Sequence, residues 1–323
     1  MEEKNLKILV DAMGGDNAPE AIVKGALLAA ARTEDTIALI GPKKRIYELL
    51  ENECPEGIPA NIMTVGADDV ITNDDSPVKA IKTKPNSTIV MGMNILKDGL
   101  ADVFVSAGST GALLVGGLLI CGRIKGIERP AICSLYPIVG GKPSILVDAG
   151  ANAECKPRNL YEFALMGSIF MEKVLGRENP RVGLVNIGAE AEKGNTLTKK
   201  AYELLSESDL NFVGNVEARD IPAGACDVIV ADGFTGNVVL KLSEGMVERL
   251  FSVVARKLPP EMIAGLKGQT DYSEYGGAPI LGVEKPIIKM HGASGPRAVE
   301  NAILKAADYA KTDVIGIVKE QIK

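Results

Sequence analysis

The stretch Asp227–Leu240, DVIVADGFTGNVVL, points to an α/β fold. Its alternating β-forming residues predict a strand that ends near Asp232 and Gly233, and Thr235 and Asn237 lead into a long apolar pattern typical of a helix. Ligands of open α/β sheets lie beyond the carboxyl ends of the strands, where the first amides of the next helix lack intrahelical partners. We therefore expect an anion-binding corner here.

A second stretch, DVFVSAGSTGAL at residues 102–113, repeats the Asp, both Val, the Gly, the Thr and the following Gly in the same register. The strand sequence ILVDA also occurs twice, at residues 8–12 and 145–149. Small and polar residues follow each copy, so four strands are predicted to end in Asp/Gly/Asn loops that form paired corners of one site. The expected phosphate- and substrate-binding residues are Asp11, Gly14, Gly15, Asp16, Gly108, Ser109, Thr110, Gly111, Asp148, Asn152, Asn186, Asp232, Gly233, Thr235 and His291.

The composition suits a globular α/β protein. The 323 residues are 46% apolar and include 35 Gly and no Trp, which is typical of many tight turns and close helix packing. The formal net charge of −6 argues against a general nucleic-acid binder, so an acidic partner must meet a local basic patch. Two patches are candidates, with ordinary solvated helix ends as the alternative: Lys79, Lys82 and Lys84, and Arg123, Lys125 and Arg129.

Cysteine usage and apolar runs indicate the compartment. The five cysteines are scattered without a C-x-x-C pair, as expected for reduced cytosolic thiols. The amino-terminal sequence MEEKNLK does not resemble a signal peptide, and the longest strongly apolar run, Ala112–Cys121, is far shorter than the ~18 residues that span a bilayer. We expect a cytoplasmic protein, and peripheral contact with the inner face of the cell membrane stays open.

Strand and helix patterns alternate along the chain, which predicts a three-layer α/β/α fold with a mostly parallel sheet. We expect a single α/β domain over residues 1–323, with a helical excursion at about 242–272 that faces a dimer partner or a membrane. Besides the strand in 102–113, strands are predicted at 7–11, 36–41, 61–65, 131–136, 144–148, 181–186, 212–214, 227–231 and 287–290. Helices are predicted at 19–31, 42–50, 76–84, 87–96, 157–175, 196–206, 237–257 and 297–309. A further helix is predicted to follow the strand in 102–113 and to run to about residue 122.

Motifs for common cofactors and metals are absent. The chain has no G-x-G-x-x-G after a strand, no G-x-x-x-x-G-K-[ST], no H-E-x-x-H and no cysteine cluster, so we expect no cofactor. The lone His291 could serve the site or only hold structure by hydrogen bonding. Aspartates 11, 16, 148 and 232 could bind a metal, but helix capping is the favoured interpretation. No nucleophile elbow is present, so any group transfer is expected to be direct.

Two residues could carry chemistry. Lys193 stands in a loop after a predicted strand, where it could hold a phosphate as a point charge or pair with Glu190 or Glu192. Asn237 could stabilise an oxyanion or only cap its helix.

Further along the same helix, apolar residues recur every four positions. Such a stripe usually faces a core or a dimer partner, and the apolar tip that follows it could dip into a bilayer interface. The stripe consists of Leu242, Met246, Leu250, Val254 and Leu258, and the tip of Met262, Ile263, Leu266 and Lys267.

Nine blocks of the chain, in order and over nearly its whole length, resemble the bacterial acyl-acyl-carrier-protein:phosphate acyltransferases of phospholipid synthesis. The blocks are VDAMGGDNAPEAIVKG (10–25), SAGSTGALLVGGL (106–118), GRIKGIERPA (122–131), DAGANAECKP (148–157), NIGAEAEKGNTLTK (186–199), GNVEARD (214–220), ADGFTGNVVLK (231–241), YGGAPILG (275–282) and IIKMHGASG (287–295). The segment between Leu240 and Tyr272 is shorter than in members with a long apolar hairpin for membrane contact.

The resemblance implies the isocitrate/isopropylmalate dehydrogenase-like fold, a homodimer, and transfer of an acyl group from acyl-acyl-carrier protein to inorganic phosphate. The product would pass to a membrane glycerol-3-phosphate acyltransferase. It also implies catalytic roles for Lys193, the lysine of EKGN, and Asn237, the asparagine of GFTGN.

These expectations combine into one mechanism. Phosphate binds at the two corners beside Lys193 and attacks the thioester carbonyl, while Asn237 and backbone amides stabilise the oxyanion. The carrier protein docks on one of the basic patches. Two rivals remain: a short-chain phosphate acyltransferase that uses coenzyme A, and a non-catalytic membrane scaffold.

Overall fold

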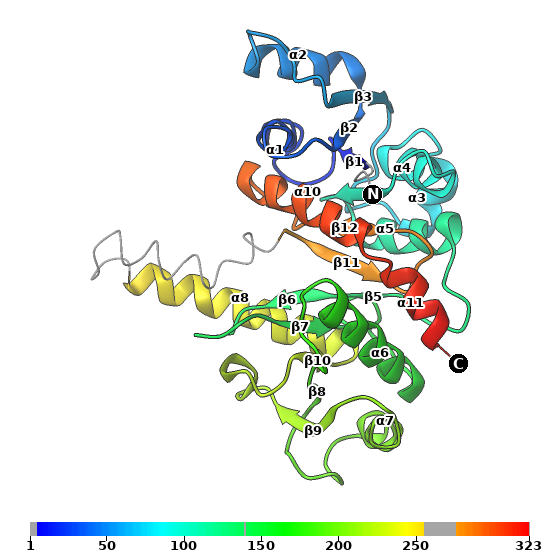
Figure 1. Cartoon of the computed structure of the whole chain (residues 1–323), viewed down its shortest axis with the longest axis vertical. Coiled ribbons are helices and arrows are strands. Elements are labelled where there is room, and N and C mark those ends of the chain that lie inside the picture. The colour runs from blue at the N-terminus through cyan, green and yellow to red at the C-terminus, as the bar shows by residue number, and fades with distance from the viewer. Residues whose placement is uncertain (1–4, 139, 255–275, 323) are drawn as a thin grey trace. The chain divides into compact units, whose positions relative to one another are not determined.

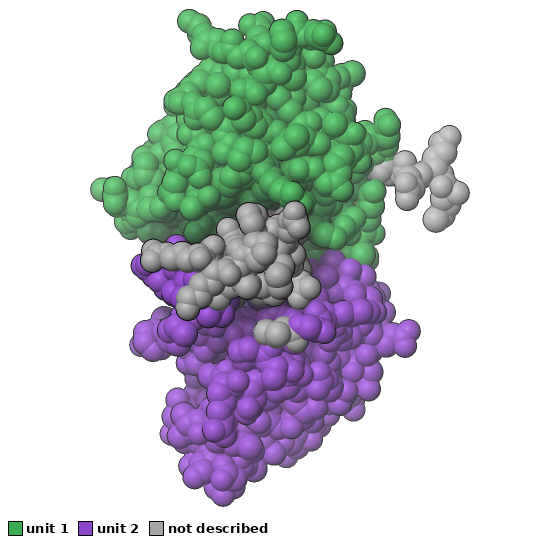
Figure 2. Space-filling model, turned by 90° about the vertical axis from the view of Figure 1, so that its left-hand side faces the viewer, with its two compact units in different colours: residues 1–124, 273–315 green, residues 125–272, 316–323 purple. Residues whose placement is uncertain are grey.

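The computed structural model describes residues 5–138, 140–254 and 276–322 (Figure 1). The chain divides into two compact units (Figure 2). Unit 1 comprises residues 1–124 and 273–315, and unit 2 comprises residues 125–272 and 316–323. The α/β class with mostly parallel strands is confirmed, and the single domain over 1–323 stays a prediction.

Unit 1 is built on strands in the order β3-β2-β1-β4-β12-β11, which are parallel except that β11 runs antiparallel to β12. The strands are β1 (Lys7–Asp11), β2 (Thr36–Gly41), β3 (Ile62–Gly66), β4 (Val103–Ser106), β11 (Ala278–Leu281) and β12 (Ile287–Lys289). The helices are α1 (Glu20–Ala30), α2 (Lys43–Glu53), α3 (Pro77–Thr83), α4 (Thr88–Lys97), α5 (Thr110–Gly116), the π-helical turn η1 (Gly117–Cys121) and α10 (Pro296–Lys311).

Both faces of the unit 1 sheet are covered by helices, as an uninterrupted apolar strand requires. In β1, successive residues point to opposite faces, and Ile8, Leu9 and Val10 are each at most 1% exposed. Leu9 belongs to a cluster with residues of α3, α4 and α5. Helices α1 and α10 pack against each other and against the strands on the side away from α4 (Figure 1).

Unit 2 is built on strands in the order β6-β7-β10-β8-β9, which are parallel except that β6 runs antiparallel to β7. The elements are β5 (Ala131–Ile132), β6 (Ser134–Tyr136), β7 (Ser144–Val147), α6 (Pro157–Lys173), β8 (Val182–Asn186), α7 (Thr196–Ser206), β9 (Phe212–Glu217), the 3₁₀ turn η2 (Ile221–Ala223), β10 (Val228–Val230) and α8 (Gly233–Val254). Helix α11 (Val314–Gln321) closes the chain.

The two sequence repeats form equivalent strand pairs. In unit 1, Ile8 of β1 lies opposite Val103 of β4, and in unit 2, Ile145 of β7 lies opposite Val228 of β10. The next two positions of each pair keep the same parallel register. The repeated sequences therefore build the same two-stranded core in each unit.

Several predicted boundaries were wrong. The strand predicted at 131–136 is divided into β5 and β6, because the Ile132 amide bonds a side chain and Cys133 has no ladder partner. Strand β9 continues to Glu217, and β11 and α11 were not predicted. The helix predicted from residue 237 begins at Gly233, since both early glycines fit a helical turn packed closely on another loop.

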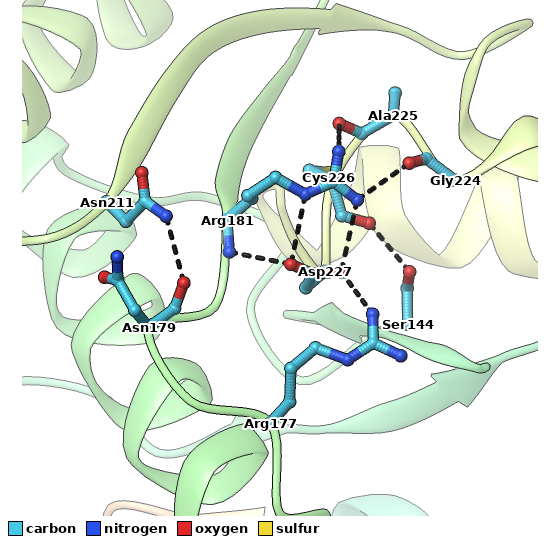
Figure 3. Close-up of polar contacts among 9 residues, drawn as sticks. All are labelled: Ser144, Arg177, Asn179, Arg181, Asn211, Gly224, Ala225, Cys226 and Asp227. Atoms are coloured by element: carbon cyan, nitrogen blue, oxygen red, sulfur yellow. Dashed lines mark hydrogen bonds and ion pairs between the residues drawn. The ribbon is translucent and has the colours of Figure 1, made fainter.

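Asp227 anchors the amino-terminal end of β10 (Figure 3). Its carboxylate is 7% exposed and accepts bonds from the Arg181 amide at 2.8 Å and the Arg181 guanidinium at 3.2 Å, and it also pairs with Arg177. Burial raises the pKa of Asp227, but the bonds from Arg181 and Arg177 outweigh it and hold the pKa below its ordinary value. The ionised carboxylate therefore stabilises the fold.

We expect Asp227→Asn to lower the free energy of unfolding at pH 7 by on the order of 3 kcal/mol, because two arginines lose a buried partner. A depressed folded-state pKa gives stability that is present above the unfolded-state pKa and lost as pH falls through the folded-state pKa. The difference between the wild type and the variant should therefore shrink below about pH 4. Urea unfolding at pH 7 and near pH 3 measures it, with the exposed Asp209→Asn as control; an unchanged difference would contradict the role of the charge.

Candidate active site

Three loops of unit 1 meet at the carboxyl edge of its sheet. Strands β1, β4 and β12 are parallel neighbours, so the loops that follow them share this edge. The Asp16 amide donates to the Gly292 carbonyl at 2.8 Å. A Cβ atom added at Gly14 would lie 2.6 Å from the Gly108 nitrogen, so only glycine permits this approach. The predicted residues from 11–16, 108–111 and 291 therefore lie at one edge.

Asp11 connects two of these loops through buried hydrogen bonds. It is 1% exposed, and its carboxylate accepts bonds from the Ser106 hydroxyl at 2.7 Å and the Met13 amide at 3.1 Å. The Gly108 amide in turn donates to the Ser106 hydroxyl oxygen at 3.0 Å. Burial raises the pKa of Asp11, and these hydrogen bonds oppose the rise. The position of Asp11 is structural, and direct contact with substrate stays a prediction.

His291 lies in the third loop, with an exposed side chain. Its Nδ1 atom accepts a bond from the Ala293 amide at 3.2 Å, and its carbonyl accepts one from the Ser294 amide at 3.1 Å. These bonds support the alternative of a structural histidine. A role of His291 in substrate binding stays a prediction.

Unit 2 repeats the arrangement of loops. Strands β7, β10 and β8 are parallel neighbours, so the loops that follow them, at 148–152, 231–233 and 187–195, share its carboxyl edge. Asp148 is fully buried at this edge. Its carboxylate accepts five bonds of 2.7 to 3.2 Å, from the Ile132, Gly150, Ala151 and Asn152 amides and the Asn152 side chain. Burial raises the pKa of Asp148, and these donors oppose the rise.

The first turn of α8 packs directly on the 148–152 loop. The Gly233 amide donates to the Asn152 carbonyl at 2.7 Å, and a Cβ atom added at Gly236 would lie 1.9 Å from the Asp148 carbonyl oxygen. Asp232 caps the helix, because its carboxylate accepts bonds from the Thr235 amide at 2.9 Å and hydroxyl at 2.8 Å. The favoured capping interpretation of Asp232 is thus confirmed.

Asn237 lies in the second turn of α8, so the interpretation that it caps the helix is wrong. Its side chain is exposed and faces the loop after β7: a Cβ atom added at Gly150 would lie 3.4 Å from Asn237 Oδ1. The amide therefore stands at the carboxyl edge of the sheet, where a ligand can reach it.

Lys193 lies in the loop after β8, and Asn186 and Gly194 fix the shape of that loop. The Asn186 side chain donates to the Lys193 carbonyl at 3.2 Å, and Gly194 has a φ of +98° that favours glycine. Among the residues described, the exposed Lys193 ammonium forms no ion pair with Glu190 or Glu192, so the pairing alternative is wrong. The charge of Lys193 is available to a ligand.

The unit 2 edge thus combines helix amides, a carboxamide and a lysine, which suits binding of an anion and stabilisation of an oxyanion. The convergence of both units on one site stays a prediction. Sequence reasoning missed Ser106, Gly150 and Gly236, although Gly236 belongs to the Thr-Gly pair that both repeated stretches share.

Neither the cysteine thiols nor any cluster of acidic side chains among the described residues adds to this chemistry. Burial raises the pKa of Cys121 and Cys155 to about 11 and that of Cys226 to about 12, so these thiols stay protonated near neutral pH. This disfavours a covalent route through any of the three. Across residues 5–138, 140–254 and 276–322, no group of three or more His, Cys, Asp or Glu residues could hold a metal ion.

Comparison with known proteins identifies close relatives. The family described as fatty acid synthesis protein matches residues 6–317. A phosphate acyltransferase of Brevibacillus brevis is 46% identical over 331 residues, with 98% of each chain covered. One from Alkaliphilus oremlandii is 47% identical over 330 residues, with 98% of this chain and 97% of the relative covered.

Solved structures share the fold at low sequence identity. A phosphotransacetylase from Streptococcus pyogenes has a TM-score of 0.67 and 18% identity, with 96% of this chain and 95% of that chain covered. A 4-hydroxythreonine-4-phosphate dehydrogenase from Klebsiella pneumoniae has a TM-score of 0.54 and 11% identity, with 96% and 98% covered. This structural similarity confirms the expected likeness to a dehydrogenase fold.

Proposed function

Because this chain belongs to the family of fatty acid synthesis proteins and is a phosphate acyltransferase, we propose that its acyl donor is a fatty acyl-acyl-carrier protein. The enzyme reversibly transfers the acyl group to inorganic phosphate. The acyl phosphate then serves a membrane glycerol-3-phosphate acyltransferase in phospholipid synthesis. The link of the family to fatty acid synthesis supports a carrier-bound donor.

One observation carries the proposed chemistry: in unit 2, the amino terminus of α8, Asn237 and Lys193 share the carboxyl edge of three neighbouring parallel strands. Phosphate binds at the amino terminus of α8, where the helix dipole is positive, and Lys193 offsets part of its charge.

The reaction then proceeds by direct displacement. A phosphate oxygen attacks the thioester carbonyl carbon and forms a tetrahedral oxyanion, which Asn237 and backbone amides stabilise. The oxyanion collapses, the C–S bond breaks, and the thiolate of the carrier leaves and takes up a proton. Positioning two bound substrates supplies much of the rate without a covalent enzyme intermediate.

The test is phosphate-dependent release of free carrier protein from a fatty acyl-acyl-carrier protein, with acyl phosphate as the second product. Turnover should be much faster than with acetyl-coenzyme A at equal concentration. Faster turnover of acetyl-coenzyme A would instead favour the short-chain alternative. No phosphate-dependent release from either donor would favour the scaffold.

We propose that the carrier docks at α3 of unit 1. Helix α3 packs on the start of α5, since a Cβ atom added at Gly111 would lie 2.6 Å from Pro77 Cγ. Lys79 and Lys82 on α3 are exposed, whereas Lys84 bonds Asp75 at 2.9 Å and so contributes little net charge. A basic helix beside the corner suits an acidic carrier.

Reversing both charges with Lys79→Glu and Lys82→Glu should raise the KM for the acyl-carrier donor at low salt by about tenfold, because two attractive charges become repulsive. The effect should fade at high salt. The matched control is Lys44→Glu with Lys97→Glu, which makes the same charge change on α2 and at the far end of α4. An unchanged KM would contradict docking at α3.

We propose that the apolar face of α8 binds a second copy of the chain. The face is exposed, so core packing within one chain is wrong for these residues, and of the two remaining alternatives, a dimer partner and a membrane, we propose the dimer. The exposed residues on the face are Leu242 64%, Met246 64%, Leu250 64% and Val253 58%. The molecular mass in solution tests the proposal: we expect twice the 34.0 kDa of one chain, and a monomer at micromolar concentration would refute it.

We place the enzyme in the cytoplasm, at the inner face of the membrane that holds its proposed product acceptor. No described helix is long and apolar enough to cross a bilayer. The expected membrane-contacting tip, Met262, Ile263, Leu266 and Lys267, lies outside the described residues, as does Leu258 of the stripe. Sedimentation with vesicles of anionic phospholipid would test peripheral binding.

A further inference from the structure

A cation that was not among the expected site residues lies beside the unit 2 edge. We infer that Arg129 is a phosphate-binding residue of this acyltransferase and that it contacts inorganic phosphate at the amino terminus of α8. The inference rests on the proposed phosphate site. In the sequence, Arg129 stands out only as a member of the basic patch of Arg123, Lys125 and Arg129.

The backbone next to Arg129 is bonded into the site. The Asn152 side chain donates to the carbonyl of Pro130 at 2.7 Å. The Asn152 carbonyl accepts a bond of 2.7 Å from the amide of Gly233, the first residue of α8. Two residues beyond Pro130, the Ile132 amide donates to the Asp148 carboxylate at 3.0 Å. Asn152 and Asp148 thus connect the segment that carries Arg129 to the first turn of α8.

Cys155 lies at the same edge, within the electrostatic influence of Arg129. Cys155 donates from its Sγ atom to the Asn152 carbonyl at 3.5 Å. Burial raises the pKa of the Cys155 thiol and the Gly233 amide opposes the rise; the carboxylates of Asp148 and Asp232 raise the pKa further, and the positive charge of Arg129 lowers it.

Arg129 is also available to a ligand. Its side chain is exposed, and it forms no ion pair with any residue that the structure describes. The neighbouring carboxylate of Glu128 is bonded to Asn159 at 3.1 Å and lies 3.8 Å from the Lys156 ammonium. The guanidinium can present two parallel N–H donors to phosphate oxygens, which an ammonium cannot.

A second cation is needed at this edge to balance its negative charges when phosphate binds. The carboxylates of Asp148 and Asp232 both lie at this edge, and they oppose a bound phosphate dianion. Helix amides contribute only about half a positive charge. Lys193 and Arg129 together offset the two carboxylates, so that a phosphate dianion can bind at this edge.

The test compares Arg129→Gln and Arg129→Lys with Lys125→Gln, which removes a positive charge from the same connection. We expect Arg129→Gln to raise the KM for phosphate about 10- to 100-fold, because the variant loses a charge-assisted bidentate contact. The KM for the acyl donor should change by less than about twofold. Arg129→Lys should recover part of the loss, because it keeps the charge without the paired donors. Lys125→Gln should leave the KM for phosphate unchanged.

A binding measurement separates this role from the overall reaction. Inorganic phosphate should raise the Tm of the wild type and of Lys125→Gln. The rise in Tm should be much smaller for Arg129→Gln. Equal Tm shifts in all three, or an effect of Arg129→Gln on the KM of the acyl donor alone, would overturn the inference. If the wild type showed the Tm shift but did not use acyl-acyl-carrier protein, the proposed donor would fail and the phosphate contact would stand.

Discussion

The Lys193→Ala variant is expected to form acyl phosphate about 10²- to 10³-fold more slowly than the wild type at subsaturating phosphate. Lys193 is exposed and unpaired among the described residues, in the loop that follows β8, and β8 is the strand next to β10. Removing it leaves a phosphate dianion next to Asp148 and Asp232 with one cation fewer, both in the bound state and when negative charge develops on the thioester oxygen. Initial rates at varied phosphate concentration measure the loss.

The matched control is Lys199→Ala, an exposed lysine on α7 six residues further along. It should keep wild-type activity, and both variants should keep the wild-type Tm, since neither side chain carries a described ion pair. If Lys193→Ala retained full activity in a folded protein, phosphate would have to bind elsewhere.

The second large effect is expected from Gly236→Ala. A Cβ atom there would lie 1.9 Å from the Asp148 carbonyl oxygen, far inside van der Waals contact with rigid backbone. The first turn of α8 must move away from the 148–152 loop, and Asn237 moves with it. We expect a loss of about 3 kcal/mol of stability and of at least 10²-fold in kcat, because misplaced oxyanion donors lose most of their effect.

The control lies on the same helix. A Cβ atom added at Gly245 meets no atom within 4 Å, so Gly245→Ala should raise stability by about 0.5–1 kcal/mol and leave kcat unchanged. Asn237→Ala separates the two effects, because it removes the amide without moving the helix: kcat should fall and Tm should hold. Thermal unfolding with steady-state kinetics measures all three variants, and wild-type kcat in Gly236→Ala would show that close packing of α8 is unnecessary for catalysis.

Local patterns predicted most elements because their signals are short-range. The alternation in 227–231 predicted β10, and Pro19, which fits the first turn of a helix, marked the start of α1. Helix α8 was placed four residues late, since two glycines usually disfavour a helix and only their packing against the 148–152 loop keeps them in one. Strand β11 was missed because it is short and contains a proline.

The two repeated strand pairs, each ending in a loop of Asp, Gly and Asn, could be predicted from the sequence alone, because strand periodicity and turn chemistry are properties of adjacent residues. The folded chain was needed to show that Asp11 and Asp148 are buried under their loops, that Asn237 faces Gly150, and that the Pro130 carbonyl bonds Asn152 at the edge of unit 2. Each of these depends on strand order and on contacts between residues far apart in the chain. Such contacts leave no periodic trace in a single sequence, so only the folded backbone could show them.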